Sequence, residues 1–431
     1  MATVNEKKKS YALPIAMMFA LFFMISFVTG LQNPLGVIVK SQFSISNFMS
    51  QLGNAANFIA YAFMGIPAGI LLSRQGYKKT ALIAIVVGFI GVGISYFSGQ
   101  AGSFGLYLTG AFVSGFSMCM LNTVVNPMLN TLGGGGNKGN QLIQFGGSIN
   151  SIGATIVPIL VGYLIGDITK ASINNANPAL FLAMGIFALA FVVLLFVDIP
   201  EPHLVKKSDV KVEKDKHSAL SFRHFVLGAI AIFIYVGIEV GIPNIANLFM
   251  TTPLANAGLG IETTIAGAIV GTYWFLMLLG RLAGGSLGNI LSSRSMLSFV
   301  ALLAIIFILA AIFSPTSVTV SMPVIKSNLS FGLANVPINI MFLTLCGICT
   351  SVMWGSIFNL AVEGLGKYTA TGSGIFMVMV FGGGIIPLIQ GKVADVSSYL
   401  SSYWVILICL VYILFYALIG SKNVNKNIPV E

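Results

Sequence analysis

Runs of about 20 apolar residues recur along the whole of this 431-residue chain, and only 8% of its residues are Asp, Glu, Lys or Arg. A helix of about 20 apolar residues crosses the hydrocarbon core of a bilayer, whereas a soluble domain carries about 25% charged residues. The sequence therefore predicts an all-α membrane protein. Twelve such runs can be marked, at 12–38, 45–73, 79–98, 103–128, 140–166, 178–198, 222–248, 261–290, 295–314, 334–361, 370–391 and 400–420.

The placement of the basic residues predicts the orientation of the chain. If the N-terminus lies in the cytoplasm, most of the 22 Lys and Arg fall in cytoplasmic segments, and only Lys40, Lys170, Lys326 and Lys392 fall outside. The positive-inside rule then puts both termini in the cytoplasm, which requires an even number of spans. The net charge of +10 reflects this asymmetry and does not indicate nucleic-acid binding.

The chain divides into two similar parts. Residues 199–221 form the one long charged stretch, which we interpret as a cytoplasmic linker between bundles at 1–198 and 222–431. Gly65-x-x-Ala68-Gly69 in the first part is echoed by Gly280-x-x-Ala283-Gly284 in the second. Parallel repeats of this kind are typical of transporters with the substrate site between the halves. The segment 314–336 is long for a loop, and we expect a short interfacial helix in it.

One acidic residue lies deep inside a predicted span. Glu239 is near the middle of the run IFIYVGIEVGIPNIANLF at 232–249, while the other acids fall in tails, loops or helix ends. A carboxylate at the centre of a membrane helix costs about 2.5–3.5 kcal/mol, so it is rarely kept without a use. Glu239 is therefore a candidate proton carrier or substrate contact, although it could also be a hydrogen-bonded structural group. Pro243, four residues on, is expected to open the helix and free a carbonyl.

Cys346-x-x-Cys349 has the spacing of a metal-binding pair, but it lies in an apolar span without a second pair. The sequence therefore predicts no metal or cofactor site, and it does not predict an enzyme. The cysteines fall inside apolar spans, where free Cys behaves as a small buried hydrophobe. No Walker A lysine is present, so transport driven directly by ATP is not expected from this chain. The cysteines are Cys119, Cys346, Cys349 and Cys409.

The turn between the second and third runs, Gly69-Ile-Leu-Leu-Ser-Arg74-Gln-Gly76-Tyr-Lys78-Lys79, resembles the signature loop of the major facilitator superfamily, with Ser73 where that family usually has Asp. Further short matches, in order, resemble the fucose–galactose–glucose:proton symporter family. They include Ser10-Tyr-Ala-Leu-Pro14, Gly65-Ile-Pro-Ala-Gly-Ile-Leu, Asn126-Pro127, Asn150-Ser-x-Gly-Ala, Tyr235-Val-Gly-x-Glu239-Val, Leu365-Gly and Gly382-Gly-Gly-Ile.

The resemblance implies the major facilitator fold, with 12 transmembrane helices in two pseudo-symmetric six-helix bundles. It also implies import of a monosaccharide with a proton. Asn33 and Asn122 stand where that family has acids, and an amide hydrogen-bonds sugar hydroxyls but carries no proton. Glu239 is thus left as the candidate for proton coupling.

Polar and aromatic side chains within the spans are the candidates for sugar binding. Amides can hydrogen-bond hydroxyl groups in pairs, and aromatic rings can stack on the C–H face of a sugar. Any one of them could instead hold neighbouring helices together. The candidates are Gln32, Asn33, Asn57, Asn122, Asn126, Gln144, Asn150, Tyr235, Asn244, Asn247, Tyr273, Trp354 and Asn359. Arg281, near the inner end of its span, is interpreted as an anchor that reaches the membrane boundary.

The sequence thus predicts a monomeric transporter of a bacterial inner membrane, surrounded by lipid, which imports a hexose or deoxyhexose such as glucose, galactose or fucose by proton symport with alternating access. Three alternatives remain. A sodium-coupled or uncoupled sugar carrier is the nearest, because two of the acids typical of the family are missing. An exporter of amphiphiles or drugs would line its cavity with fewer amides. A membrane sensor with the same fold would bind sugar without moving it.

Overall fold

The computed structural model describes residues 11–133, 136–165, 171–201, 217–287, 291–325, 330–425 and 427–430. The first bundle contains α1 (Ala12–Gly30), α2 (Gln32–Phe43), α3 (Asn47–Ser50), α4 (Leu52–Ala101), α5 (Phe104–Leu132), α6 (Gly136–Ile165) and α7 (Asn177–Phe196). The second contains α8 (Arg223–Thr251), α9 (Thr263–Leu287), α10 (Ser293–Phe313), β1 (Thr319–Ile325), β2 (Phe331–Pro337), α11 (Ile338–Ser351), α12 (Met353–Val362), α13 (Thr369–Met379), α14 (Gly382–Val396) and α15 (Tyr403–Phe415), which continues as a π-helix, Tyr416–Gly420.

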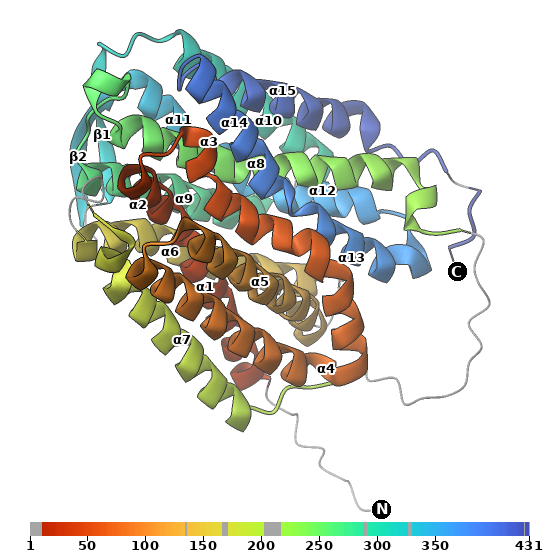
Figure 1. Ribbon diagram of the computed structural model, residues 1–431. Coiled ribbons are helices and arrows are strands. Elements are labelled where there is room, and N and C mark those ends of the chain that lie inside the picture. The colour runs from red at the N-terminus through yellow and green to blue at the C-terminus, as the bar shows by residue number, and fades with distance from the viewer. Residues whose placement is uncertain are drawn as a thin grey trace, which may run out of the picture.

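Within the described residues, 12 helical segments are long and apolar enough to cross a membrane, as predicted. Some spans consist of two helices: α1 and α2 form Ala12–Phe43, and α11 and α12 form Ile338–Val362. Conversely, α4 holds two spans, Leu52–Leu72 and Arg74–Ala101. Figure 1 shows α1, α4, α5 and α7 grouped on one side and α8 with α10–α15 on the other. The boundary of the two bundles at 199–221 stays a prediction, since residues 202–216 lie outside the described part.

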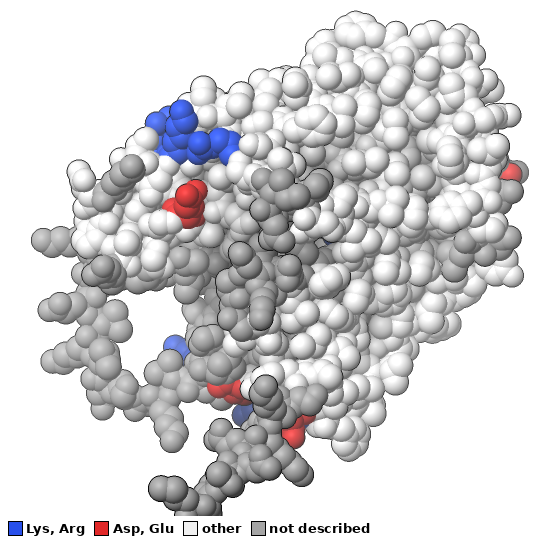
Figure 2. Space-filling model, turned by 180° about the vertical axis from the view of Figure 1, so that it is seen from behind, with Lys and Arg blue, Asp and Glu red and all other residues white. Residues whose placement is uncertain are grey.

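The two ends of the molecule differ. We call the end at which the chain passes from α7 towards α8 the linker end, and the opposite end, which carries β1 and β2, the hairpin end (Figure 1). In Figure 2 the coloured charged side chains gather mainly towards the linker end, and a broad face between the ends shows none. An uncharged band of this kind is the surface that lipid covers in a helical membrane protein.

The connection between α10 and α11 is a β-hairpin, so the predicted interfacial helix within 314–336 is wrong. β1 pairs antiparallel with β2, with Ile325 opposite Phe331. The backbone N–H of Ile325 donates to Oγ1 of Thr272 in α9 at 3.2 Å, which fixes the hairpin to its neighbour. In β1 Val320, Met322 and Val324 share the more buried face, a period of two that belongs to a strand.

The turn inside α4 depends on one glycine. Gly76 has φ 82° and ψ 177°, a backbone conformation that other residues adopt only with strain. The carboxylate of Glu201, just after α7, accepts the backbone N–H groups of Tyr77 at 2.7 Å and Lys78 at 3.0 Å. A Cβ atom on Gly76 would meet this carboxylate. The loop at 69–79, which resembles the signature loop of the superfamily, is therefore hydrogen-bonded to the start of the segment that leads to the second bundle.

Close packing of α4 against α5 depends on small residues. A Cβ atom added to Gly115 in α5 would collide with the carbonyl oxygen of Asn57 in α4. The Asn57 amide donates in return to the carbonyl oxygen of Ala111, one turn before Gly115, at 3.2 Å. Glycine lets the two backbones approach, and van der Waals contact and hydrogen bonds hold helices together in lipid.

We predict that Gly115→Ala destabilises the protein by about 1–3 kcal/mol, because the added methyl group meets backbone that cannot rotate away. Thermal unfolding in detergent measures this. Gly185→Ala in α7 is the matched control, since a Cβ atom there has no neighbour within 4 Å. A Gly115→Ala variant as stable as the control would show that the helices shift apart at little cost.

Candidate functional site

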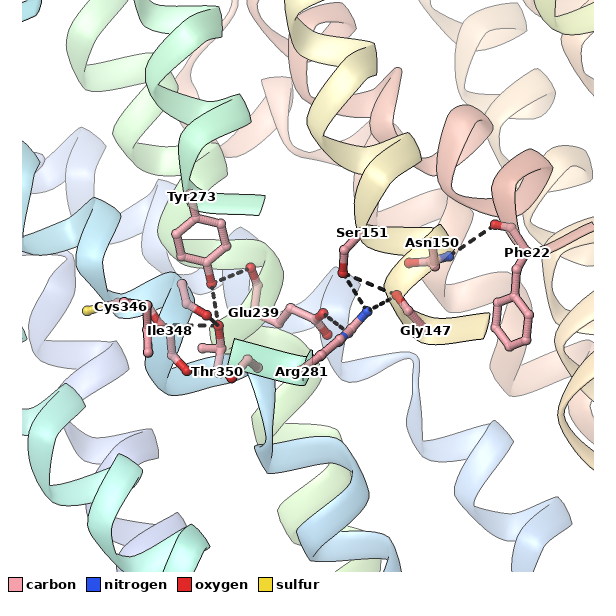
Figure 3. Close-up of polar contacts among 12 residues, drawn as sticks. Phe22, Gly147, Asn150, Ser151, Glu239, Tyr273, Arg281, Cys346, Ile348 and Thr350 are labelled. Atoms are coloured by element: carbon pink, nitrogen blue, oxygen red, sulfur yellow. Dashed lines mark hydrogen bonds and ion pairs between the residues drawn. The ribbon is translucent and has the colours of Figure 1, made fainter. Parts of the chain in front are cut away.

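The centre of the molecule holds an ion pair between two neighbouring helices. Nη2 of Arg281 in α9 lies 3.3 Å from Oε1 of Glu239 in α8, and the side chains are 13% and 15% exposed. Figure 3 shows the guanidinium group directed at this carboxylate. The interpretation of Arg281 as an anchor at the membrane boundary is therefore corrected. Its side chain turns into the protein because the buried carboxylate offers a better partner than the membrane surface.

The same guanidinium group also binds the first bundle. Nη1 of Arg281 donates to the carbonyl oxygen of Gly147 at 2.7 Å and to Oγ of Ser151 at 2.8 Å, both in α6 (Figure 3). A guanidinium group has five N–H donors in a fixed plane, so it can serve several acceptors at once. Arg281 thus joins Glu239 of the second bundle to α6 of the first.

A proline shapes the backbone beside Glu239. Pro243 lies inside α8 and has no N–H, so the carbonyl oxygen of Glu239, four residues earlier, loses its helical donor. The hydroxyl group of Tyr273 in α9 donates to this carbonyl oxygen at 3.2 Å. Oγ1 of Thr350 in α11 lies 3.1 Å from the same hydroxyl (Figure 3). The carbonyl oxygen of Glu239 is thus released from the helix, as expected, and Tyr273, a predicted site residue, binds it.

Aromatic residues lie next to the ion pair. Tyr235 is fully buried and lies one turn before Glu239 in α8. The ring centroids of Tyr235 and Trp354 in α12 are 6.2 Å apart. Trp354 is half-buried. The second bundle therefore places an acid, a base and aromatic rings together, which suits a polar ligand with an apolar face.

Amide groups follow two helices of the first bundle. Nδ2 of Asn122 donates to the hydroxyl oxygen of Tyr61 at 3.0 Å, and Nδ2 of Asn126 donates to the carbonyl oxygen of Asn122 at 2.9 Å. Nδ2 of Asn150 in α6, one turn after Gly147, donates to the carbonyl oxygen of Phe22 in α1 at 3.3 Å (Figure 3). All three asparagines are half-buried. Asn150 is one residue from Ser151 and so stands beside the Arg281 contact.

The remaining candidates are spread over the molecule. Asn57 is fully buried between α4 and α5, whereas Asn359 at the linker end is exposed. Oε1 of Gln32 accepts the hydroxyl group of Tyr107 at 3.3 Å, and Nδ2 of Asn244 donates to Oε1 of Gln51 at 3.2 Å. Asn247 is buried one helical turn beyond Pro243. The side chains of Asn33 and Gln144 lie outside the described residues. The role of each in sugar binding stays a prediction.

A second carbonyl oxygen that a proline leaves without its helical donor is bound by a side chain, and this bond crosses between the bundles. Pro387 in α14 deprives the carbonyl oxygen of Gly383 of its helical donor. Nδ2 of Asn54 in α4 donates to that oxygen at 2.9 Å. The sequence predicts that Asn54 lies in the span at 45–73 and counts it among the amides that fit a sugar site, but it does not predict this partner. The signal that could have found its partner is the position four residues before a proline.

The four cysteines are free and buried, as predicted from the apolar runs around them. Cys346 donates its thiol to the carbonyl oxygen of Phe342 at 3.4 Å within α11. Its neighbour Cys349 is also fully buried. They therefore pack as small side chains within α11, close to the Thr350 hydroxyl that contacts Tyr273.

Comparison with known proteins agrees with this architecture. A sequence profile of the Major Facilitator Superfamily matches residues 18–388. The chain is 31% identical over 424 residues to a protein named glucose/galactose transporter from Brucella abortus biovar 1 (strain 9-941), with 98% of this chain and 97% of that protein covered. It is 23% identical over 444 residues to a protein named L-fucose-proton symporter from Escherichia coli, with 97% and 96% covered.

The fold matches as well. A crystal structure of FucP, a Major Facilitator Superfamily transporter in the outward conformation, superposes with a TM-score of 0.70 at 21% identity, covering 96% of this chain and 100% of that one. The predicted 12-helix fold in two bundles is thereby confirmed. Because the profile covers most of the chain and the relative at 31% identity covers nearly all of it, this protein belongs to the Major Facilitator Superfamily, a family of transporters and not of enzymes.

Proposed function

We propose that this protein imports a neutral hexose or deoxyhexose together with a proton, and that Glu239 carries the proton. The observation that carries the proposal is the position of Glu239. Its carboxylate lies between the bundles, and Arg281, which pairs with it, also bonds to α6 of the other bundle. A group that changes charge at this place acts on both bundles at once.

The coupling follows from the chemistry of the pair. While Glu239 is ionised, its charge is balanced by Arg281 and the site as a whole is neutral. When a proton neutralises Glu239, the attraction to Arg281 falls, and both groups become able to hydrogen-bond sugar hydroxyls. Proton and sugar then bind together. A proton moving down a membrane potential supplies about 2.3 kcal/mol per 100 mV, which is enough to concentrate a neutral sugar.

The relatives and the residues around the pair support a sugar as the cargo. The relatives compared above are named for glucose, galactose and L-fucose, and the more distant one also for a proton. Trp354 offers an aromatic face, and Asn150 and Asn122 offer amides on the first bundle. Neutral cargo also suits a site in which the acid and the base already balance each other.

The orientation completes the proposal. The excess of Lys and Arg in the segments at the linker end supports an orientation with that end and both termini in the cytoplasm of a bacterial cell. The hairpin end then faces outward, and the protein works as a monomer in the inner membrane. Alternating access moves the two bundles about the Arg281 contact.

We predict that Glu239→Gln abolishes accumulation of sugar but preserves counterflow exchange, because glutamine accepts the hydrogen bond from Arg281 but carries no proton. Uptake of labelled glucose, galactose and fucose into proteoliposomes, with and without a pH gradient, measures both activities. The matched control is Glu262→Gln, which changes an exposed acid just before α9. Accumulation of sugar by the Glu239→Gln variant would contradict the role of Glu239 as proton carrier. Wild-type uptake that depends on a sodium gradient and not on a pH gradient would show that sodium is the coupling ion.

Arg281 and Glu239 are expected to be energetically coupled. Arg281→Gln should destabilise the protein more in the presence of Glu239 than in the Glu239→Gln background, with a coupling energy of about 1–3 kcal/mol. Removing the base leaves a carboxylate without compensation in a site of low dielectric constant. Thermal unfolding of the two single variants and the double variant gives the value. The pair Arg281→Gln and Glu262→Gln serves as the control, and an equal coupling energy there would refute the interaction.

Trp354 is expected to contact the sugar. Trp354→Ala should raise the KM for uptake roughly fivefold and change kcat less, since loss of an aromatic face removes about 1 kcal/mol of binding. The control is Trp404→Ala in α15, a tryptophan that is 43% exposed and packs edge-on against Phe313. Equal KM values for both variants would place the sugar elsewhere.

A further inference from the structure

At the hairpin end, Asp395 joins the two bundles. This residue lies one position before the last residue of α14, in the second bundle. Its Oδ1 accepts the backbone N–H of Asn47 at 2.8 Å, and its Oδ2 accepts the backbone N–H of Phe48 at 2.9 Å. Both donors begin α3 of the first bundle. A single carboxylate thus caps a helix that belongs to the opposite bundle.

Lys40 makes the complementary contact from the first bundle. Its Nζ, in the last turn of α2, donates to Oγ1 of Thr252 at 3.0 Å and to the hydroxyl oxygen of Tyr399 at 2.8 Å. It also lies 5.5 Å from the centre of the Tyr399 ring. Thr252 follows α8 and Tyr399 follows α14, so both acceptors belong to the second bundle.

Tyr399 links the two contacts into one network. The Tyr399 hydroxyl group donates to Oδ1 of Asn47 at 3.0 Å. Nζ of Lys40 and Oγ1 of Thr252 each lie within hydrogen-bond distance of the Tyr399 hydroxyl oxygen. The Tyr399 ring is 5% exposed and stacks on Phe249. The Tyr399 hydroxyl group thus contacts Lys40 directly and is linked to Asp395 through Asn47, and hydrogen bonds in such a network strengthen one another.

We propose that Asp395 and Lys40 are positioning residues of an outer gate, which holds the hairpin end shut and so sets how often the central site faces outward. Each makes its charge-assisted bonds to groups of the opposite bundle, so every one of them breaks when the bundles part at this end. The inference rests on the proposed transport function for its purpose, and on the proposed orientation for the word outer. The contacts themselves do not depend on either.

The gate can be measured as a distance. Nitroxide labels on Gln100→Cys and Asn256→Cys report the separation of the bundles at the hairpin end, and labels on Gln75→Cys and Lys422→Cys report it at the linker end. All four positions are exposed, and the four native cysteines are buried. Pulsed electron paramagnetic resonance on the full chain in lipid nanodiscs then gives the populations of the two arrangements.

We expect Asp395→Ala and Lys40→Met each to raise roughly tenfold the population ratio of the arrangement open at the hairpin end to the arrangement closed there. The distance at that end lengthens while the distance at the linker end shortens. A loss of fold would broaden both distributions and would not move them in opposite directions. Lys392→Gln, an exposed charge one turn before Asp395, is the matched control and should leave both distances unchanged.

Unchanged distances in Asp395→Ala and Lys40→Met would overturn the gate. The same result from Lys392→Gln as from Asp395→Ala would also overturn it, since the effect would then come from surface charge alone. Failure of the transport proposal is seen separately, as absence of sugar uptake by the wild-type protein. In that case the distances still show whether the two residues hold the hairpin end shut.

Discussion

The arrangement of the centre depends on one guanidinium group. Arg281 neutralises Glu239 on its own side and donates to Gly147 and Ser151 on the other side. Without it, a carboxylate would remain in a region where lipid and apolar side chains cannot solvate charge, and α6 would lose a partner on α9. Charge balance and contact between the bundles therefore depend on the same guanidinium group, and the proposed proton coupling through Glu239 rests on this link.

Two prolines leave backbone carbonyl oxygens without their helical donors, and side chains of other helices bind these oxygens. Pro243 frees the carbonyl oxygen of Glu239, and Pro387 frees that of Gly383. Tyr273 binds the former within its own bundle, whereas Asn54 binds the latter from the other bundle. Each of these side chains binds one particular backbone oxygen of a neighbouring helix. The helices therefore cannot slide along one another without losing a hydrogen bond.

Hydropathy predicted the spans and the central place of Glu239, because apolar length and the cost of a buried charge are properties of single helices. It did not predict the partner of Glu239. Arg281 lies near the inner end of its span, and its direction depends on which helix lies beside it, a matter of tertiary packing. The hairpin in 314–336 was missed for a related reason, since Thr272 on a distant helix helps to hold β1 in place.

The bond between Asn54 and Gly383 has a consequence for the two states of a transport cycle. It crosses between the bundles, so it lasts only while they are close at that level. Because Pro387 supplies no N–H, the helix cannot restore a donor to the Gly383 oxygen once Asn54 withdraws. An acceptor without a donor then faces the opening between the bundles, where water or a sugar hydroxyl can reach it. Separation of the bundles at this level would therefore add a hydrogen-bond acceptor to the space between them.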